Sequence, residues 1–366
     1  MSDQIVPILL PKWGLSMKEG TLAAWHVEAG TEIKPGDEIM DVETDKIANV
    51  VEAADGGLLR RCVGAAGEVY PVQALLGVMA PVEVSDAEVD AYVDAFEMPE
   101  VEEDEEEVPS HLTVDLDIGR IRYMTREGEG TPVIFIHGFG GDSDNWLFNV
   151  DAIAADAPVY ALDLPGHGGS VKTIESPDLG TMVQAVTQLM DHLSIDKAHL
   201  VGHSMGGLVS GQMAIKHSNR VSSLTLICSA GLGDEINADY IDGFVSAASR
   251  KELKPKLKHL FADAGLVSRS MVDDLLKYKR LDGVQAFLEA LSSNLFSEGK
   301  QGVSIAESVA GSGVPTTVIW GAEDAVIPQS HSGAVSGAKV EVIEGAGHMA
   351  MMENSGRVNE LVKEQL

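Results

Sequence analysis

The stretch Gly202-His203-Ser204-Met205-Gly206-Gly207 decides the fold of the larger part of this 366-residue chain. It follows the apolar run His199–Gly202, which predicts a buried strand. The stretch fits the pattern G-x-S-x-G, in which small residues beside the serine permit a sharp turn from strand to helix and lift the hydroxyl above a sheet. An ordinary turn serine would also fit so short a pattern. The surrounding sequence therefore has to discriminate between a nucleophile and a turn.

Apolar runs alternate with amphipathic segments on both sides of this turn. Residues 177–194 place their apolar side chains on one helical stripe, as a crossover helix requires. The alternation predicts an α/β domain with a doubly wound, mostly parallel sheet that begins with a hairpin about Gly119. The expected strands are Leu112–Ile118, Arg120–Arg126, Val133–Ile136, Val159–Leu164, His199–Gly202, Leu224–Cys228, Thr317–Trp320 and Val340–Ile343.

Two further polar residues follow predicted strands. Asp324 ends the segment Trp320–Asp324, and His348 ends the segment Gly345–His348. Ligands bind at the carboxyl ends of strands in open α/β sheets, so both side chains are expected beside Ser204. A serine hydroxyl is a weak nucleophile unless a histidine accepts its proton and an acid orients that histidine. We therefore predict a catalytic triad of Ser204, Asp324 and His348.

The triad residues occur along the chain in the order Ser204, Asp324, His348. This order is the one expected for the α/β-hydrolase family, which residues 111–366 resemble. The resemblance implies that Phe135–Gly141 is the oxyanion loop and that the backbone N–H groups of Phe139 and Met205 stabilise the developing negative charge. The family pattern favours Asp324 over its neighbour Glu323 as the acid. The histidines inside motif loops are interpreted as structural; they are His137, His167 and His203.

Residues 234–312 contain few strand signals and many apolar residues at helical spacing. We expect them to form a helical cap over the site, where substrate selectivity would reside.

The first 80 residues contain short β segments separated by Gly and Pro. They also contain an internal repeat with an offset of 36 residues. Two similar half-sheets, neither able to bury its apolar face alone, predict a small two-fold sandwich or flattened barrel. The matching pairs are Leu22 and Leu58, Val27 and Val63, Ile33 and Val69, Pro35 and Pro71, Ile39 and Leu75, and Val42 and Val78.

Between the two halves, residues Asp41–Ala48 are predicted to form a hairpin with Lys46 at its tip. A lone lysine at a turn is ordinarily only solvated. The repeat, the segment Pro11–Gly20 and the residues Glu43–Lys46 together resemble the lipoyl domains of 2-oxo acid dehydrogenase complexes. This resemblance implies lipoate in amide linkage on Lys46. Biotin carriers flank their lysine with Met on both sides, whereas Asp45 and Ile47 stand here, so lipoate is favoured over biotin.

The chain has 26 basic and 57 acidic side chains, a net charge of −31. Nucleic acid is therefore an improbable partner, because phosphate binding needs clustered Lys and Arg. Residues 81–110 contain 13 acidic residues and no basic ones. A block of like charges repels itself and stays extended. We interpret 81–110 as a flexible acidic linker between a domain at 1–80 and a domain at 111–366, serving as a spacer or as a docking site for a basic partner. Val89, Tyr92, Val93 and Phe96 lie at helical spacing, which allows a short helix before the acidic run.

No run approaches the roughly 18 apolar residues of a membrane span, and the N-terminus lacks a signal-peptide pattern. We therefore expect a cytoplasmic protein without membrane contact. Cys62 and Cys228 lie in different domains without metal-ligand spacing, so we expect two buried free thiols and no metal site.

The whole chain resembles the dihydrolipoamide acetyltransferase (E2) family of bacterial acetoin dehydrogenase complexes. The resemblance implies transfer of acetyl from S-acetyldihydrolipoyl-Lys46 to coenzyme A through an acyl-Ser204 intermediate. It also implies a homo-oligomer working with a thiamine-diphosphate-dependent acetoin dehydrogenase (E1) and a dihydrolipoamide dehydrogenase (E3). The H-x-x-x-D-G signature and subunit-binding domain of E2 proteins from pyruvate complexes are not found here.

Two other functions fit the same residues. In a serine hydrolase or thioesterase, water would resolve the acyl-enzyme and release a carboxylic acid. In a lipoyl carrier, the hydrolase domain would be mainly a scaffold.

Overall fold

A computed structural model describes residues 5–11, 17, 19–44, 48–96, 111–297 and 299–366. The chain divides into two compact units, Met1–Val108 and Pro109–Leu366. Each unit has its own core, and each is described by itself.

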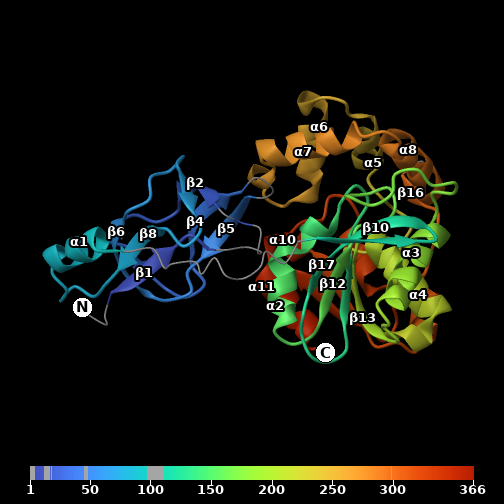
Figure 1. Ribbon diagram of the computed structural model, residues 1–366, viewed down its shortest axis with the longest axis horizontal. Coiled ribbons are helices and arrows are strands. Elements are labelled where there is room, and N and C mark those ends of the chain that lie inside the picture. The colour runs from blue at the N-terminus through green and yellow to red at the C-terminus, as the bar shows by residue number, and fades with distance from the viewer. Residues whose placement is uncertain (1–4, 12–16, 18, 45–47, 97–110, 298) are drawn as a thin grey trace. The chain divides into compact units, whose positions relative to one another are not determined.

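Unit 1 is built from two four-stranded antiparallel sheets (Figure 1). Their strand orders are β1-β8-β6-β3 and β5-β4-β2-β7. The sheets enclose an apolar core that includes Leu22, Ile39, Val42 and Leu59. The strands are β1 Val6–Leu9, β2 Glu19–Trp25, β3 Glu32–Ile33, β4 Glu38–Glu43, β5 Ala48–Glu52, β6 Gly57–Cys62, β7 Val69–Pro71 and β8 Leu75–Met79.

The internal repeat explains why the two sheets have the same order. An offset of 36 residues carries β2, β3 and β4 onto β6, β7 and β8, and each sheet takes strands from both halves. The repeat is not symmetric in burial: Ile33 is 2% exposed, whereas its counterpart Val69 is 55% exposed. Both residues lie in edge strands, β3 and β7, so strand order does not account for this difference in burial.

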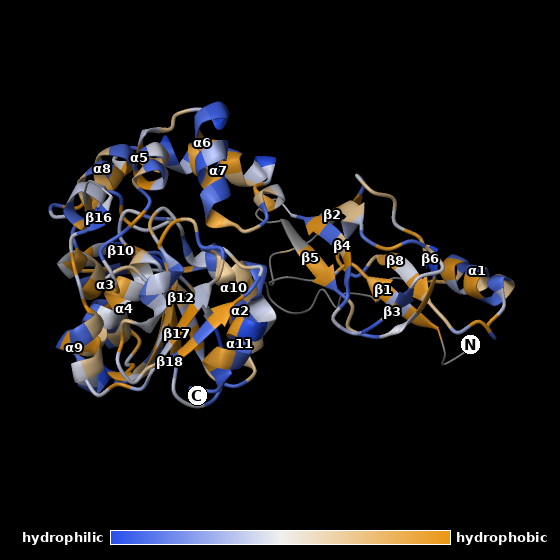
Figure 2. Cartoon of the chain, turned by 180° about the vertical axis from the view of Figure 1, so that it is seen from behind, coloured by the Kyte–Doolittle hydropathy of each residue, from blue (hydrophilic) through white to orange (hydrophobic). Residues whose placement is uncertain are grey.

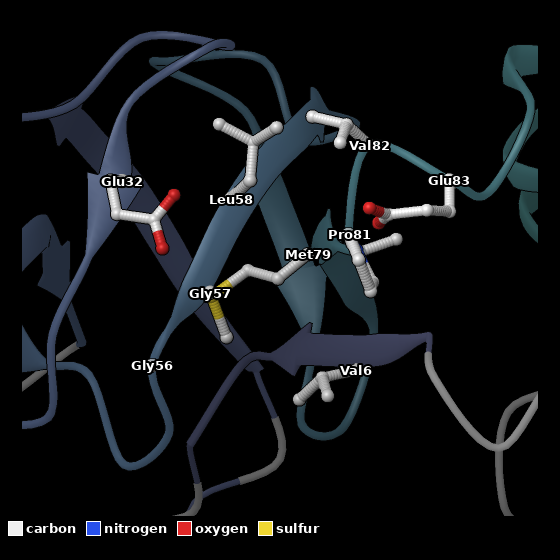
Figure 3. Close-up of a pocket in the computed structure, with 10 residues that line it drawn as sticks. Val6, Glu32, Gly56, Gly57, Leu58, Met79, Pro81, Val82 and Glu83 are labelled. Atoms are coloured by element: carbon white, nitrogen blue, oxygen red, sulfur yellow. The ribbon is translucent and has the colours of Figure 1, made fainter.

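A pocket of about 410 Å³ lies at the end of unit 1 that holds the start of β1 and the end of β8 (Figure 3). Its lining is mostly apolar, with Glu32 and Glu83 at the rim. The 36-residue offset relates Val82, which lines this pocket, to position 46 of the β4–β5 hairpin. The pocket is therefore the counterpart, in the second half of the repeat, of the hairpin in the first half. The two features belong to opposite ends of the unit. None of its lining residues is a nucleophile or histidine, so this pocket is not suited to nucleophilic catalysis.

The first half of the expected linker is folded, which corrects the boundary placed at residue 80. Helix α1, Asp86–Asp94, begins with a capping box between Ser85 and Glu88. Val89 is fully buried in a cluster with residues of β8. Arg60 and Arg61 of β6 form ion pairs with acids of the same helix, at 2.8 Å to Asp86 and 2.9 Å to Asp90, respectively. Asp86 and Asp90 therefore form ion pairs within unit 1, although the acidic composition predicted that they would be solvated in a flexible linker. The acidic run 100–107 lies outside the described residues.

Unit 2 contains an eight-stranded sheet in the order β18-β17-β14-β13-β11-β12-β10-β9. Six neighbouring strands from β18 to β12 run parallel, and β10 and β9 form an antiparallel edge hairpin. The predicted doubly wound sheet is confirmed. The strands are β9 Leu112–Leu116, β10 Gly119–Arg126, β11 Val133–Ile136, β12 Val159–Leu162, β13 Ala198–His203, β14 Val221–Ile227, β17 Thr316–Gly321 and β18 Lys339–Ile343.

Helices flank both faces of this sheet (Figure 1). The flanking helices are α2 Leu147–Ala154, α3 Leu179–His192, α4 Met205–Lys216, α9 Ala306–Gly311, α10 Ala350–Glu353 and α11 Ser355–Lys363. Short 3-10 turns are η1 Ser143–Trp146, η2 Ser218–Arg220, η3 Lys258–Leu260, η4 Ala264–Leu266 and η5 Gln329–Gly333. Over the described residues, no helix is long and apolar enough to cross a membrane.

The expected cap consists of four helices above one end of the sheet (Figure 1). They are α5 Ala238–Ser246, α6 Arg250–Leu257, α7 Arg269–Lys279 and α8 Val284–Leu295. A small hairpin, β15 Phe296–Ser297 with β16 Lys300–Gln301, follows them and was not predicted. Cys228 is a buried free thiol as expected, but Cys62 is exposed because it ends its strand at the surface.

Candidate active site

Ser204 occupies a strained turn between β13 and α4. Its backbone has φ 53° and ψ −119°, in the left-handed half of conformational space that non-glycine residues rarely adopt. A Cβ at Gly202 would clash with Ser210, and one at Gly206 would clash with the carbonyl of Ile136. The glycines around Ser204 are therefore required by packing, and the turn presents the serine at the carboxyl end of the sheet.

His348 and Asp324 form a buried hydrogen-bonded pair. His348 Nδ1 donates to Asp324 Oδ2 at 2.8 Å, and the two side chains are 2% and 0% exposed. The other oxygen of Asp324 accepts the N–H groups of Val326 and Ile327 at 2.8 and 2.9 Å. These bonds fix the carboxylate as an acceptor, so Nδ1 keeps its proton and Nε2 is left as a base. Glu323, the alternative acid, is exposed.

Cys228 is the one feature near this pair that suggests a metal. Its sulfur, an oxygen of Asp324 and a ring nitrogen of His348 lie within 4.8 Å of one another. Burial is the main reason that the pKa of the Cys228 thiol is raised well above its usual value, and the charge of Asp324 adds to it. A neutral thiol is a poor ligand, and Asp324 is already held by three donors. The geometry therefore fits a triad acid better than a metal centre.

The residue before the nucleophile anchors His348. His203 Nε2 donates to the backbone oxygen of His348 at 2.9 Å, and the two rings lie 4.8 Å apart. This contact holds His348 beside the Ser204 turn. No hydrogen bond joins the Ser204 hydroxyl to His348 in the part of the chain that is described, and such bonds often tighten only when substrate binds.

The oxyanion loop lies directly against Ser204. A Cβ at Gly138 would lie 3.0 Å from Ser204 Cβ, so only glycine allows this approach. The backbone N–H groups of Phe139 and Met205 have no acceptor among the described residues. Two unsatisfied donors beside a nucleophile are the arrangement that stabilises a tetrahedral oxyanion, an effect worth about 3 kcal/mol per donor.

Asp163 braces this loop, a role that the sequence alone did not indicate. Its carboxylate accepts the backbone N–H groups of Ser143 and Gly169 at 2.8 and 2.7 Å and pairs with Arg122. Asp163 thereby connects the end of β12 to the turn after the oxyanion loop. The available signal was its position at the end of a predicted strand, the same signal that identified Asp324.

His137 and His167 have the structural roles expected of them. His137 Nδ1 donates to the Gly138 oxygen at 2.8 Å, and its Nε2 accepts the Leu164 N–H at 2.9 Å. His167 Nδ1 donates to the Pro165 oxygen at 3.0 Å. Burial lowers the pKa of His137 to about 4 and that of His167 to about 3. Both rings are therefore neutral near pH 7.

These two pKa values predict loss of stability in acid. Below about pH 6.5 these histidines are protonated in the unfolded chain but stay neutral in the folded protein. The free energy of unfolding therefore falls as the pH is lowered. His137 alone contributes a loss of about 3 kcal/mol between pH 6.5 and 4. Urea unfolding in a W13F/W25F background, which leaves Trp146 and Trp320 of unit 2 as fluorescent probes, measures this slope.

The substitution His137→Gln should flatten that slope, whatever it does to stability at pH 7. His192→Gln is the matched control, because His192 is exposed on α3. Equal slopes for the His137 variant and wild type would contradict the assignment of a buried neutral ring.

Aromatic side chains of the cap close over the oxyanion loop. The ring of Phe139 lies 5.8 Å from that of Phe244 on α5 and 6.1 Å from that of Phe296. Tyr240, one turn before Phe244, has a pKa raised mainly by burial and also by the charge of Asp324. The cluster excludes water from one side of the nucleophile and strengthens electrostatic interactions there.

Lys46 lies outside the described residues, but its hairpin is present. Strands β4 and β5 pair with Glu43 opposite Ala48. The sequence between these two residues includes Lys46, and the prediction that it stands at the hairpin tip stays a prediction.

Family models match both units. A biotin/lipoyl-attachment model, described as biotin-requiring enzyme, matches residues 6–79, and an α/β-hydrolase-fold model matches residues 131–355. A solved meta-cleavage product hydrolase from Pseudomonas fluorescens is 26% identical, with a TM-score of 0.63 over 69% of this chain and 96% of that one. The fold and the site thus define a biotin/lipoyl-type carrier unit joined to an α/β-hydrolase unit.

Two relatives match almost the whole chain. Both are described as the dihydrolipoyllysine-residue acetyltransferase component of an acetoin cleaving system. The Cupriavidus necator protein is 52% identical over 100% of this chain and 98% of its own length, and the Pseudomonas putida protein is 47% identical over 98% and 97%. The chain belongs to this acetyltransferase family.

Proposed function

We propose that this protein transfers an acetyl group from a lipoyl thioester to coenzyme A in acetoin breakdown, with Ser204 as the nucleophile. The observation that carries the proposal is the buried His348–Asp324 pair beside the strained Ser204 turn, in one chain with a lipoyl-type carrier unit. The two acetyltransferase relatives support the same reaction.

Lipoate would be held in amide linkage by Lys46, which lies in the sequence between β4 and β5. When bound there, it supplies a dithiol that carries the acetyl group as a thioester. Unit 1 contributes presentation only, because its described pocket lies at the other end and holds no acid, base or nucleophile suited to acyl transfer except carboxylates at its rim.

In the first half-reaction, Ser204 Oγ attacks the carbonyl carbon of the acetyl thioester while His348 Nε2 accepts the hydroxyl proton. Asp324 stabilises the resulting imidazolium. The oxyanion is bound by the N–H groups of Phe139 and Met205. The C–S bond then breaks, His348 returns the proton to the departing thiolate, and acetyl-Ser204 remains.

In the second half-reaction, the thiol of coenzyme A gives its proton to His348 and attacks acetyl-Ser204. The same two N–H groups bind the second oxyanion. Its collapse breaks the bond to Ser204 Oγ, which recovers the proton from His348. The products are acetyl-CoA and free enzyme, and the aromatic cluster of the cap disfavours water as the competing acceptor.

The wider assembly follows from the same family. We place the protein in the cytoplasm, in a homo-oligomer that receives acetyl groups from a thiamine-diphosphate-dependent acetoin dehydrogenase and returns reduced lipoyl groups to a dihydrolipoamide dehydrogenase. Residues 97–110 would serve as the tether between the two units.

The ratio of acetyl-CoA to acetate among the products distinguishes this function from its main alternative, a hydrolase. With acetyl-dihydrolipoamide as donor, we expect acetyl-CoA to form in stoichiometric amount when coenzyme A is present and little acetate to form without it. A hydrolase would instead release acetate at the same rate with or without coenzyme A. The rival deserves this test because the α/β-hydrolase unit resembles solved hydrolases.

A further inference from the structure

Positive charge is concentrated on one segment of the cap, residues 250–280, in a strongly acidic protein. Residues 250–258 contain five basic side chains and one acidic one. Over residues 250–280 the count is nine basic to four acidic, whereas the whole chain has 26 basic to 57 acidic. Helix α6 stands out as largely hydrophilic in Figure 2. This segment therefore differs in charge from the protein that carries it.

Three lysines of this region form one exposed stripe. Lys251, Lys254 and Lys258 are spaced i, i+3 and i+7 and are all exposed. The opposite side of the helix buries Leu253 and Leu257 against the cap. We call Lys251, Lys254 and Lys258 the lysine stripe.

The stripe is electrically unpaired, in contrast to its neighbours. Arg250 binds Asp273 of α7, and Lys256 binds Asp239 of α5 at 2.6 Å. The one acid of the segment, Glu252, accepts the backbone N–H of Ala248 at 3.0 Å. Within the described ranges, no carboxylate forms an ion pair with any of the three stripe lysines.

One helix, α5, packs between the helix of the stripe and the residues around the serine site. Helix α6 packs between α5 and α7, and packed helices lie about 8–10 Å apart. Helix α5 carries Tyr240 and Phe244, which adjoin Asp324 and the oxyanion loop. A ligand anchored on the stripe by one end would therefore need a long flexible arm to bring its other end to the nucleophile.

We propose that the lysine stripe binds the phosphate groups of coenzyme A, so that the pantetheine arm delivers its thiol to acetyl-Ser204. This inference rests on the proposed function. A chain of net charge −31 repels a polyanionic co-substrate, and a local positive surface offsets that repulsion and steers the ligand to the site. Lysines suit phosphates without demanding a fixed bidentate geometry.

The test compares coenzyme A with pantetheine, which has the same thiol arm and no phosphates. The variant K251Q/K254Q/K258Q is compared with K34Q/K197Q/K216Q, in which three other exposed lysines are changed and the net charge shifts equally. At low ionic strength we expect the stripe variant to raise the KM for coenzyme A about tenfold, with kcat and the KM for pantetheine unchanged. The control should match wild type for both thiols.

Calorimetric titration with coenzyme A alone gives a readout that needs no turnover, and the stripe variant should lose about the same factor in affinity. Unchanged KM and affinity for coenzyme A, or equal changes for coenzyme A and pantetheine, would overturn the proposal. A rise only in the KM for acetyl-dihydrolipoamide would assign the stripe to binding of the acyl donor instead and would also overturn the proposal. Failure of the wild type to acetylate either thiol would count against the proposed function, while the titration would still decide the stripe.

Discussion

Replacement of Ser204 by alanine is expected to lower acetyl transfer from acetyl-dihydrolipoamide to coenzyme A by about 10⁴-fold or more. The reason is that the variant lacks the Ser204 hydroxyl, the nucleophile that accepts the acetyl group. It keeps the His348–Asp324 pair and both oxyanion donors. A residual rate above the solution reaction is expected, because oxyanion stabilisation and binding remain. Production of acetyl-CoA is the measurement.

Ser218→Ala is the matched control, since Ser218 is exposed in a short turn of the same unit. Wild-type thermal stability in both variants would exclude unfolding as the cause. If Ser204→Ala kept the wild-type rate, the hydrolase unit would be a scaffold, or coenzyme A would attack the thioester directly.

Replacement of Lys46 by arginine is expected to abolish acetoin-dependent formation of acetyl-CoA in the reconstituted system. Arginine keeps the positive charge but offers no primary amine for the lipoyl amide bond. The intact mass of the chain expressed with lipoate should show the adduct in wild type and not in the variant. The variant should still acetylate coenzyme A from free acetyl-dihydrolipoamide, because Ser204, His348 and Asp324 are untouched.

Lys34→Arg serves as the control, because Lys34 is another exposed lysine of unit 1. An adduct that persists in the Lys46 variant would place lipoate on another lysine. Loss of activity toward the free donor would show that the two units do not work as separable parts.

The fold of unit 2 was predictable because each parallel strand is a short apolar run ending in a turn, and burial on both faces of the sheet imposes that pattern. The candidate triad was predictable for a related reason. The carboxyl ends of β13 and β17 carry Ser204 and Asp324, and the loop after β18 carries His348, so chain order alone brings them to one edge.

Other features depend on contacts between distant residues. The spacing of its apolar residues indicated helix α1, but its docking involves Arg60 and Arg61, some 25 residues earlier, which no local pattern reveals. The β15–β16 hairpin has strands of two residues, too short for periodicity to register. The aromatic cluster joins the oxyanion loop to the cap across about 100 residues. The unequal burial of Ile33 and Val69 is not visible in the repeat, which pairs these two residues as equivalents.

The central claim, that acetyl transfer passes through Ser204, is tested most directly by intact and peptide mass spectrometry of the full chain mixed with acetyl-dihydrolipoamide in the absence of coenzyme A. We predict a mass increase of one acetyl group, located on the peptide that contains Ser204, and its disappearance with formation of acetyl-CoA when coenzyme A is added. An unmodified Ser204 in rapidly quenched samples, with acetyl-CoA still formed at the wild-type rate once coenzyme A is present, would contradict the account.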